Sequence, residues 1–172
     1  SHPAQETILL RAAGSGGMYD EDGTLDILSP SVPRAWWVAS ACWQPDQPSL
    51  ESALLNPEWD PHIQVHLRGT GDCSAPIETD FVAATVKDEN NIVTVTFNAP
   101  ESGWLVLADT FYPGWNASID GQSLPVERAN GAFRAVAVQA GSQTILFEYR
   151  PWWLIPGALL SLFSLLILLV LF

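Results

Sequence analysis

The feature that most constrains this chain is its C-terminal segment Trp152–Phe172, which holds no charged residue and consists almost entirely of apolar side chains. As an α-helix, these 21 residues would extend about 31 Å, close to the roughly 30 Å thickness of a bilayer's hydrocarbon core. The remaining domain, residues 1–150, is too small to surround such a helix. The segment 151–172 is therefore predicted to be a single C-terminal transmembrane helix.

Residues at the start of this segment fit the surface of a membrane. Trp152 and Trp153 carry rings that favour the interface between bilayer and water, and Arg150 stands just outside. These three residues are the predicted membrane anchor. The domain before them has few basic residues, which favours an extracytoplasmic location, periplasmic or extracellular. We therefore expect a single-pass protein of the cell membrane, with the lipid bilayer as one partner.

All charged residues precede the apolar segment, and acidic ones dominate. The chain has 19 Asp and Glu against 7 Lys and Arg, a net charge of −12, and Lys87 is its only lysine. This balance argues against nucleic acid and anionic lipid headgroups as partners. The eight tryptophans and the regular spacing of apolar residues argue against disorder. About 150 residues are expected to form one domain with its own core.

Most of this domain is predicted to consist of short strands separated by turns rich in Gly, Pro, Asp and Asn. With turns every 8–12 residues or so, the expected fold is all-β, an antiparallel β-sandwich with one short helix. The expected strands are Glu6–Ala12, Thr24–Ser29, Arg34–Trp43, His62–Arg68, Phe81–Lys87, Ile92–Asn98, Gly103–Phe111, Trp115–Ile119, Ser123–Arg128, Phe133–Gln139 and Thr144–Arg150.

Local signals define the helix and three hairpins. The helix is predicted over Ser49–Leu55, with Ser49 as its N-cap and Asn56-Pro57 ending it. Hairpin turns are predicted at residues 88–91, at Asp120-Gly121-Gln122 and at residues 140–143. The Asp-Gly pair supplies the positive φ angles that a tight hairpin requires.

The two cysteines allow two interpretations. A disulfide between Cys42 and Cys73 would close a loop of about 30 residues and would favour an oxidising compartment. Two free buried cysteines are the alternative. The sequence leaves both open.

Two groups of side chains resemble parts of metal sites, but neither has a complete set of ligands. Asp20–Gly23 together with Asp26 looks like half a calcium loop, but the matching ligand positions hold Met18 and Ser29. A solvated acidic turn is expected instead. His62 and His66 lie on the same face of a predicted strand, without a third ligand, and are expected to be exposed.

Signals for catalysis are missing from the sequence. It contains no Gly-x-Ser-x-Gly element, no phosphate-binding glycine loop, no dinucleotide fingerprint and no cysteine with a local histidine partner. We therefore predict no catalytic residues, no metal and no cofactor for this chain.

The most informative stretch surrounds Tyr112-Pro113-Gly114-Trp115, which is predicted to form a type II turn after a buried strand. One interpretation is an exposed aromatic and polar surface on which a sugar ring stacks. The other is structural, with Trp and Tyr fixing the turn against the core and arginines paired to carboxylates such as Asp109, Asp120 or Glu127. The candidate ligand-binding residues are Tyr112, Trp115, Asp120, Arg128, Asn130 and Arg134.

The same region carries a family resemblance. The run SGWLVLADTFYPGWNASIDGQSLPVERANGAFRAVAVQAGSQTILFEYRP, followed by an apolar helix, resembles the C-terminal end of the YfhO family. The segments VPRAWWVASACW, LESALLNPEWDP and HIQVHL are also similar to that family's extracytoplasmic domain. The resemblance covers the chain from about Val32 onward and is strongest over residues 102–151. Asn116, Gln122 and Ser142-Gln143 depart from it, since the family often carries basic residues there.

The resemblance implies a polytopic bacterial membrane protein related to lipid-linked-sugar glycosyltransferases. Enzymes of that kind carry their catalytic carboxylates in loops between early transmembrane helices, which these 172 residues do not include. The expected function is therefore a non-catalytic recognition or assembly module, joined to a longer membrane chain or to other membrane-protein subunits, with a glycan as a candidate ligand. The alternative is a structural accessory subunit of a larger membrane complex, such as an electron-transport assembly.

Overall fold

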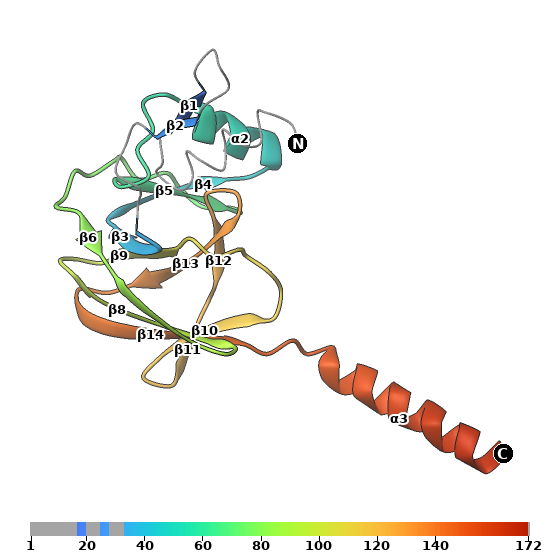
Figure 1. Cartoon of the computed structure of the whole chain (residues 1–172). Helices are drawn as coiled ribbons and strands as arrows, with labels where there is room; N and C mark the ends of the chain where they lie inside the picture. The colour runs from blue at the N-terminus through green and yellow to red at the C-terminus, as the bar shows by residue number, and fades with distance from the viewer. Residues whose placement is uncertain (1–16, 20–24, 28–32, 172) are drawn as a thin grey trace.

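The computed structural model of the chain describes residues 17–19, 25–27 and 33–171 and consists mostly of β-strands (Figure 1). The strands are β1 (Gly17–Tyr19), β2 (Leu25–Ile27), β3 (Ala35–Val38), β4 (Ser40–Gln44), β5 (Gln64–Arg68), β6 (Val82–Ala83), β7 (Thr85–Glu89), β8 (Ile92–Ala99), β9 (Gly103–Leu107), β10 (Trp115–Ile119), β11 (Gln122–Leu124), β12 (Glu127–Ala129), β13 (Phe133–Val138) and β14 (Gly141–Tyr149). The helices are α2 (Gln47–Leu55) and α3 (Leu154–Leu171).

Five strands form an antiparallel sheet in the order β11-β10-β14-β8-β7. In β8 the side chains alternate as the sequence predicts, with Val93, Val95 and Phe97 buried and Thr96 exposed on the other face. The long strands β8 and β14 are paired from Ile92↔Glu148 to Ala99↔Gly141. This sheet therefore has one face in the core and one face toward solvent.

The second sheet has seven strands in the order β4-β5-β12-β13-β9-β3-β6. Strands β3 and β4 are separated only by Ala39, yet they stand near opposite ends of this order. Because one residue cannot span a flat sheet of that width, the sheet must curl until its ends meet. The predicted continuous strand Arg34–Trp43 is therefore divided in two at this corner.

One pair in this sheet is parallel, which corrects the prediction of a purely antiparallel sandwich. Strand β4 pairs in parallel with β5, from Ser40↔Gln64 to Gln44↔Arg68. A parallel connection requires a crossover of a dozen or more residues, usually through a helix, and α2 supplies it. Mostly β structure with one short helix in the domain is thus confirmed, with a β-α-β unit at one end.

The curled sheet produces two cores. The first lies between the two sheets and includes Trp37, Leu105, Val136, Ile145 and Phe147. The second is enclosed by the curl itself and is formed by Trp36, Val38, Val65, Leu67, Val106, Ala129, Phe133 and Ala135, among others. Neighbouring residues such as Trp36 and Trp37 point into different cores, so several strands of this sheet are buried on both faces.

Helix α2 begins earlier than predicted. Its N-cap is Asp46 rather than Ser49, because the Asp46 Oδ1 atom accepts the backbone N–H of Ser49 at 2.8 Å. The predicted end at Asn56 is confirmed. Leu50 and Leu54 are buried and hold the helix against the domain.

Helix α3 follows β14 after a short connection and projects away from the β domain (Figure 1). Its large apolar side chains with described positions, including Ile155, Leu160 and Phe163, are 44–70% exposed. No helix within the described ranges meets the length and apolarity needed to cross a membrane. The division into residues 1–150 and a membrane segment 151–172 stays a prediction.

Near the N-terminus, β1 and β2 form an antiparallel pair in which Met18 lies opposite Asp26. The predicted strand Thr24–Ser29 overlaps β2. The predicted strand Glu6–Ala12 and the acidic turn Asp20–Gly23 lie outside the described residues.

Candidate functional site

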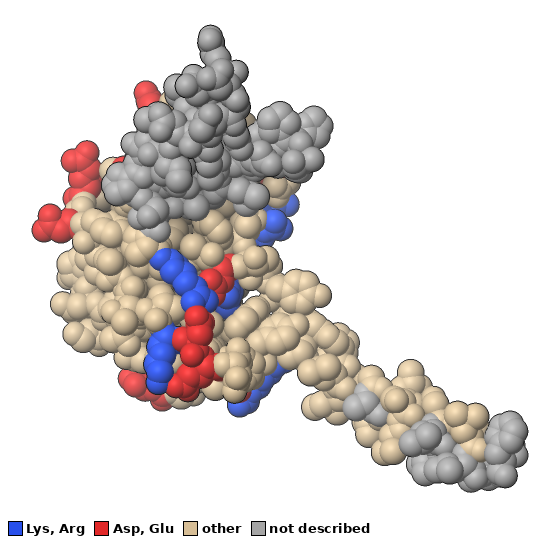
Figure 2. All heavy atoms as spheres, viewed as in Figure 1, with Lys and Arg blue, Asp and Glu red and all other residues tan. Residues whose placement is uncertain are grey.

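Four charged side chains from both sheets meet at the edge of the core between the sheets. Arg34, just before β3, donates through Nε to Asp109 Oδ1 at 2.8 Å and through Nη2 to Asp88 Oδ1 at 3.0 Å. Arg134, on β13, donates through Nη2 to Asp109 Oδ2 at 2.8 Å. Asp88 lies on β7 of the five-stranded sheet, so the network joins the two sheets. Figure 2 shows basic and acidic side chains side by side on this face.

Arg134 is the buried member of this network, with only 2% of its side chain exposed. Its guanidinium carbon lies 4.0 Å from the centre of the Trp115 ring and 5.6 Å from that of Phe147. Burial lowers the pKa of Arg134, and the nearby Asp109 carboxylate opposes this shift. The hydrogen bonds that Arg34 donates to the carboxylates of Asp109 and Asp88 raise the pKa of Arg34. Both arginines therefore remain charged, and Arg134 acts as a clamp between the sheets.

The predicted turn at Tyr112–Trp115 is confirmed and lies beside α3. Gly114 has φ = 103°, and the Trp115 N–H faces the Tyr112 carbonyl at 3.5 Å, as in a type II turn. A Cβ atom on Gly114 would lie 3.0 Å from the Tyr149 ring and 3.1 Å from the Pro151 Cα. The glycine thus allows the turn to pack closely against the segment that leads into α3.

Five aromatic residues, which we call the aromatic cluster, connect this turn to the helix. Its members are Tyr112, Trp115, Tyr149, Trp152 and Trp153. Trp115 and Tyr149 have ring centres 5.3 Å apart, Tyr112 and Trp153 6.3 Å, and Trp152 and Trp153 6.1 Å. The cluster therefore runs from the clamp at Arg134 to the beginning of α3.

The candidate ligand-binding residues do not form one exposed surface. Trp115 and Arg134 are in contact, but Arg134 is buried. Asn130 is fully buried in the turn between β12 and β13, where its Oδ1 atom accepts the His66 backbone N–H at 2.9 Å. These two side chains therefore cannot stack beneath a sugar, which corrects that part of the predicted surface. Arg134 instead pairs with Asp109, as the structural interpretation expected.

The remaining candidates occupy separate places. Arg128, on β12, donates through Nε to the Gly131 carbonyl within the same hairpin. Asp120, at φ = 49°, forms the tip of the β10–β11 hairpin with Gly121 and confirms the predicted turn there. Tyr112 is 55% exposed at the aromatic cluster. Arg150 is exposed and donates through Nε to Glu148 at 2.7 Å. Ligand binding at Tyr112, Trp115, Asp120 and Arg128 stays a prediction.

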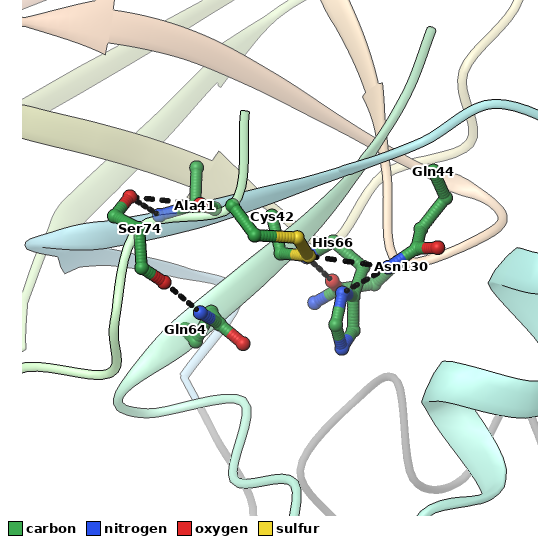
Figure 3. Close-up of a disulfide and its surroundings, with 8 residues drawn as sticks. Ala41, Cys42, Gln44, Gln64, His66, Ser74 and Asn130 are labelled. Carbon is green, nitrogen blue, oxygen red and sulfur yellow. Dashed lines mark hydrogen bonds between the residues drawn. A yellow bond between two sulfur atoms is a disulfide. The ribbon is translucent and has the colours of Figure 1, made fainter. Parts of the chain in front are cut away.

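At the other end of the β domain, Cys42 on β4 forms a disulfide with Cys73 (Figure 3). The imidazole of His66, on the neighbouring strand, lies beside this bridge, with its Nδ1 atom 3.3 Å from Gln44 Nε2. His66 is only 5% exposed, so the prediction that it is exposed is wrong. Its strand is covered on both faces, by the curled core on one side and by Trp59 on the other.

A pocket of about 240 Å³ opens between the end of α2, the following loop and β5. Trp59 and His66 line it, with ring centres 5.3 Å apart. Glu58, Asp60 and Gln64 also line it. Sequence reasoning missed this pocket, because the residues after Asn56 were considered only as the end of a helix. Throughout the described ranges, no cluster of three or more His, Cys, Asp or Glu is placed to bind a metal.

Comparison with known proteins gives one match. Residues 79–161 match the family model of the bacterial membrane protein YfhO. This matched segment, just under half of the chain, is similar to the YfhO family. No curated protein and no solved structure matches it. The family resemblance found in the sequence is thereby confirmed, and membrane localisation follows from the family.

The YfhO match covers the chain from just before β6 to Ser161 in α3. It contains Asp88, Asp109 and Arg134 of the charged network and all of the aromatic cluster. Arg34, the disulfide and the pocket at Trp59 lie before the matched segment. The YfhO segment thus includes the part of the domain that leads into α3, and the pocket is built from residues outside it.

Because burial lowers the pKa of His66, the stability of the domain is expected to fall as the pH drops below about 6.5, the ordinary histidine pKa. The unfolded chain then binds a proton that the folded chain does not, and the loss continues down to the folded-state pKa. Chemical denaturation from pH 8 to pH 5 measures it. The difference in free energy of unfolding between the unmodified chain and His66→Gln is expected to change between pH 8 and pH 5. His62→Gln is the control. The same pH-dependent change in stability difference for both variants would contradict the assignment of the effect to His66.

Proposed function

We propose that this chain is a membrane-anchored recognition and assembly module with its β domain on the extracytoplasmic side and α3 in the bilayer. The observation that carries the proposal is α3 itself. It is an uncharged helix that leaves the β domain (Figure 1). It exposes large apolar side chains such as Leu154, Leu160 and Ile167. Such a surface is stable only when lipid or other apolar helices cover it.

The residues around the start of α3 support the same placement. Trp152 is 75% exposed and Tyr112 is 55% exposed, and both belong to the aromatic cluster. Tyr and Trp side chains combine an apolar ring with a polar atom and favour the interface of a membrane. Arg150, also exposed, stands on the domain side of the cluster. A charged residue, aromatic rings and an apolar helix thus follow one another along the chain. This order suits a domain that lies against the lipid headgroups.

The disulfide supports the extracytoplasmic side. Disulfides persist in oxidising compartments such as the bacterial periplasm and the cell surface, and are rare in the cytosol. The sequence contains only two cysteines, and the bridge between Cys42 and Cys73 uses both of them. A domain folded around it is therefore best suited to the outside of the cytoplasmic membrane.

A binding role fits the domain better than a catalytic one. The carboxylates of Asp88 and Asp109 are engaged by Arg34 and Arg134, so neither is poised as a general acid or base. Within the recognition role, we propose that the domain serves a larger membrane assembly. One form is the glycan-recognising part of a cell-envelope glycosyltransferase, and the other is an accessory subunit of another membrane complex.

The anchoring is tested by alkaline carbonate extraction of membranes that contain the full chain. We expect the chain to remain with the membrane, and a chain ending at Pro151 to be released. The variant Leu160→Arg/Ile167→Arg should also be released, because each central arginine costs about 2.5–3.5 kcal/mol. The matched control Ile77→Arg/Phe81→Arg changes two exposed apolar residues of the β domain and should be retained. Retention of both double variants would contradict anchoring by α3.

The side of the membrane and the assembly role are tested separately. Protease added to intact spheroplasts should digest the β domain, whereas protection of the domain would contradict the extracytoplasmic side. Native purification in mild detergent should yield a stable complex with other membrane proteins. A chain that purifies alone would contradict the assembly role, and the composition of a complex would distinguish its two forms.

A further inference from the structure

An open groove of about 290 Å³ lies on the outer face of the five-stranded sheet, where β10, β11 and β14 are neighbours. Asn116, Ser118, Glu148 and Arg150 are among the residues that line it. Asn116 is exposed while the next residue, Ala117, is buried in the core, which places the groove on the solvent side of the sheet. Figure 1 shows that α3 leaves the β domain from this part of the sheet. In the proposed placement of the chain, the groove therefore lies beside the lipid headgroups.

A single ion pair gives this groove both a positive and a negative group. The Nε atom of Arg150 lies 2.7 Å from the Oε1 atom of Glu148. Within the described part of the chain, neither side chain has a further charged or hydrogen-bonded partner. The guanidinium has several more N–H groups and the carboxylate has several more acceptor positions, so most of this capacity remains for a ligand. Arg150 is 72% exposed and Glu148 is 23% exposed, so a ligand in the groove can reach both.

The two charges favour a ligand that is itself a zwitterion. A purely anionic group at Arg150 would also approach the Glu148 carboxylate, on a chain whose net charge is −12. A purely cationic group at Glu148 would likewise approach the guanidinium of Arg150. A group with one negative and one positive end can pair with both side chains at once. The headgroup of a zwitterionic phospholipid has this form, because a short carbon chain joins its phosphate to its amine.

The lining of the groove also distinguishes between two kinds of amine. Proteins bind a quaternary ammonium group, such as that of choline, between aromatic rings. None of the described residues that line the groove is aromatic. A primary ammonium group instead donates hydrogen bonds to oxygen atoms. Glu148 offers a carboxylate, Ser118 offers a hydroxyl, and Asn116 keeps its Oδ1 atom as an acceptor because its Nδ2 atom donates to the Gly114 carbonyl at 3.2 Å. The groove therefore suits ethanolamine better than choline.

We propose that the groove at Asn116, Ser118, Glu148 and Arg150 binds the headgroup of phosphatidylethanolamine. The phosphate pairs with the guanidinium of Arg150, and the ammonium group donates to the carboxylate of Glu148. Arg150 directly precedes the short segment that enters α3, so the headgroup of a lipid packed beside the start of this helix lies close to the groove. This inference rests on the proposed membrane placement and adds to it the class of lipid that the β domain recognises.

Native mass spectrometry of the full chain in detergent tests the proposal. The lipids added are phosphatidylethanolamine, phosphatidylcholine and phosphatidylglycerol with identical acyl chains, so that contacts with α3 are the same for all of them. We expect phosphatidylethanolamine to bind about fivefold more tightly than phosphatidylcholine, because an exposed charge pair changes affinity by up to about that factor. Glu148→Gln should remove this preference. The control Glu89→Gln changes an exposed carboxylate that is paired with Lys87 on β7, outside the groove, and should keep the preference. Arg150→Gln should weaken the binding of both lipids, since both carry a phosphate.

Three results would overturn the proposal. The first is equal binding of phosphatidylethanolamine and phosphatidylcholine by the unmodified chain, and the second is the same lipid preference in Glu148→Gln and its control. The third is tighter binding of phosphatidylglycerol than of phosphatidylethanolamine, which would make the groove a site for anionic headgroups. Circular dichroism on each variant separates loss of binding from loss of the fold. Carbonate extraction of the same chain reports on anchoring alone. A chain that is retained but binds all three lipids equally would thus contradict the headgroup site and leave the anchoring intact.

Discussion

Replacing Arg134 with methionine is expected to destabilise the β domain by about 3 kcal/mol, the lower end of the range for breaking a buried ion pair. The substitution leaves Asp109, whose side chain is 18% exposed, without its buried partner. It also removes the cation that stacks on Trp115 at 4.0 Å. Arg34 still pairs with Asp109, which keeps the loss from being larger.

Urea unfolding of the chain in detergent micelles measures this loss. Arg150→Met is the matched control, since Arg150 is 72% exposed and its ion pair with Glu148 is on the surface. Such pairs contribute about 0–1 kcal/mol, so the control should unfold close to the unmodified chain. Equal unfolding midpoints for the two variants would show that Arg134 is not a clamp between the sheets.

The double variant Cys42→Ser/Cys73→Ser is expected to lose about 3–4 kcal/mol of stability. The disulfide joins residues 31 apart, and without it the unfolded chain regains the freedom of that loop. The bridge also ties β4 to the segment after β5, at the parallel end of the curled sheet. The expected result is a lower urea midpoint at an otherwise unchanged fold.

A reducing agent provides the control for this experiment. It should lower the midpoint of the unmodified chain to about that of the double variant, and it should leave the double variant unchanged. If the reductant has no effect on the unmodified chain, the bridge does not stabilise the domain. If it lowers both midpoints equally, the effect belongs to the reductant and not to the disulfide.

The sequence predicts well those elements that depend on nearby residues. The β10–β11 hairpin follows from Asp120-Gly121, and both residues have the positive φ angles that this pair favours. Strand β8 follows from its alternation of apolar and polar side chains. The N-cap was missed, although Asp46 followed by Pro48 is itself a helix-start signal. The error came from preferring Ser49, which lies inside the first turn.

Elements that depend on distant residues were harder to predict. The sequence of β5 alternates, which indicates one exposed face, but α2 and Trp59 cover that face and bury His66. The parallel pairing of β4 and β5 depends on the corner at Ala39, which no local pattern marks.

The site residues show the same limit. Arg34 reaches Asp109, 75 positions away, and no spacing rule indicates that pair. Asp109 was one of three carboxylates expected to pair with an arginine, together with Asp120 and Glu127, and it is the one that Arg134 contacts. Trp59 was missed because a single tryptophan after a helix carries no motif, and its neighbours His66 and Gln64 come from another element.

The direct passage from β14 into α3 has a mechanical consequence. Strand β14 is central in its sheet and is paired with β8 from Gly141 to Glu148 on one side and with β10 from Ile145 to Tyr149 on the other. Hydrogen bonds in antiparallel pairs run perpendicular to the strands, so a pull on α3 along β14 loads many of them at once, in shear. The Arg150 N–H bond to the Gly114 carbonyl, 2.7 Å long, braces the exit point. Tension on α3 would thus be shared by the ladders on both sides of β14 and would not fall on a single hydrogen bond.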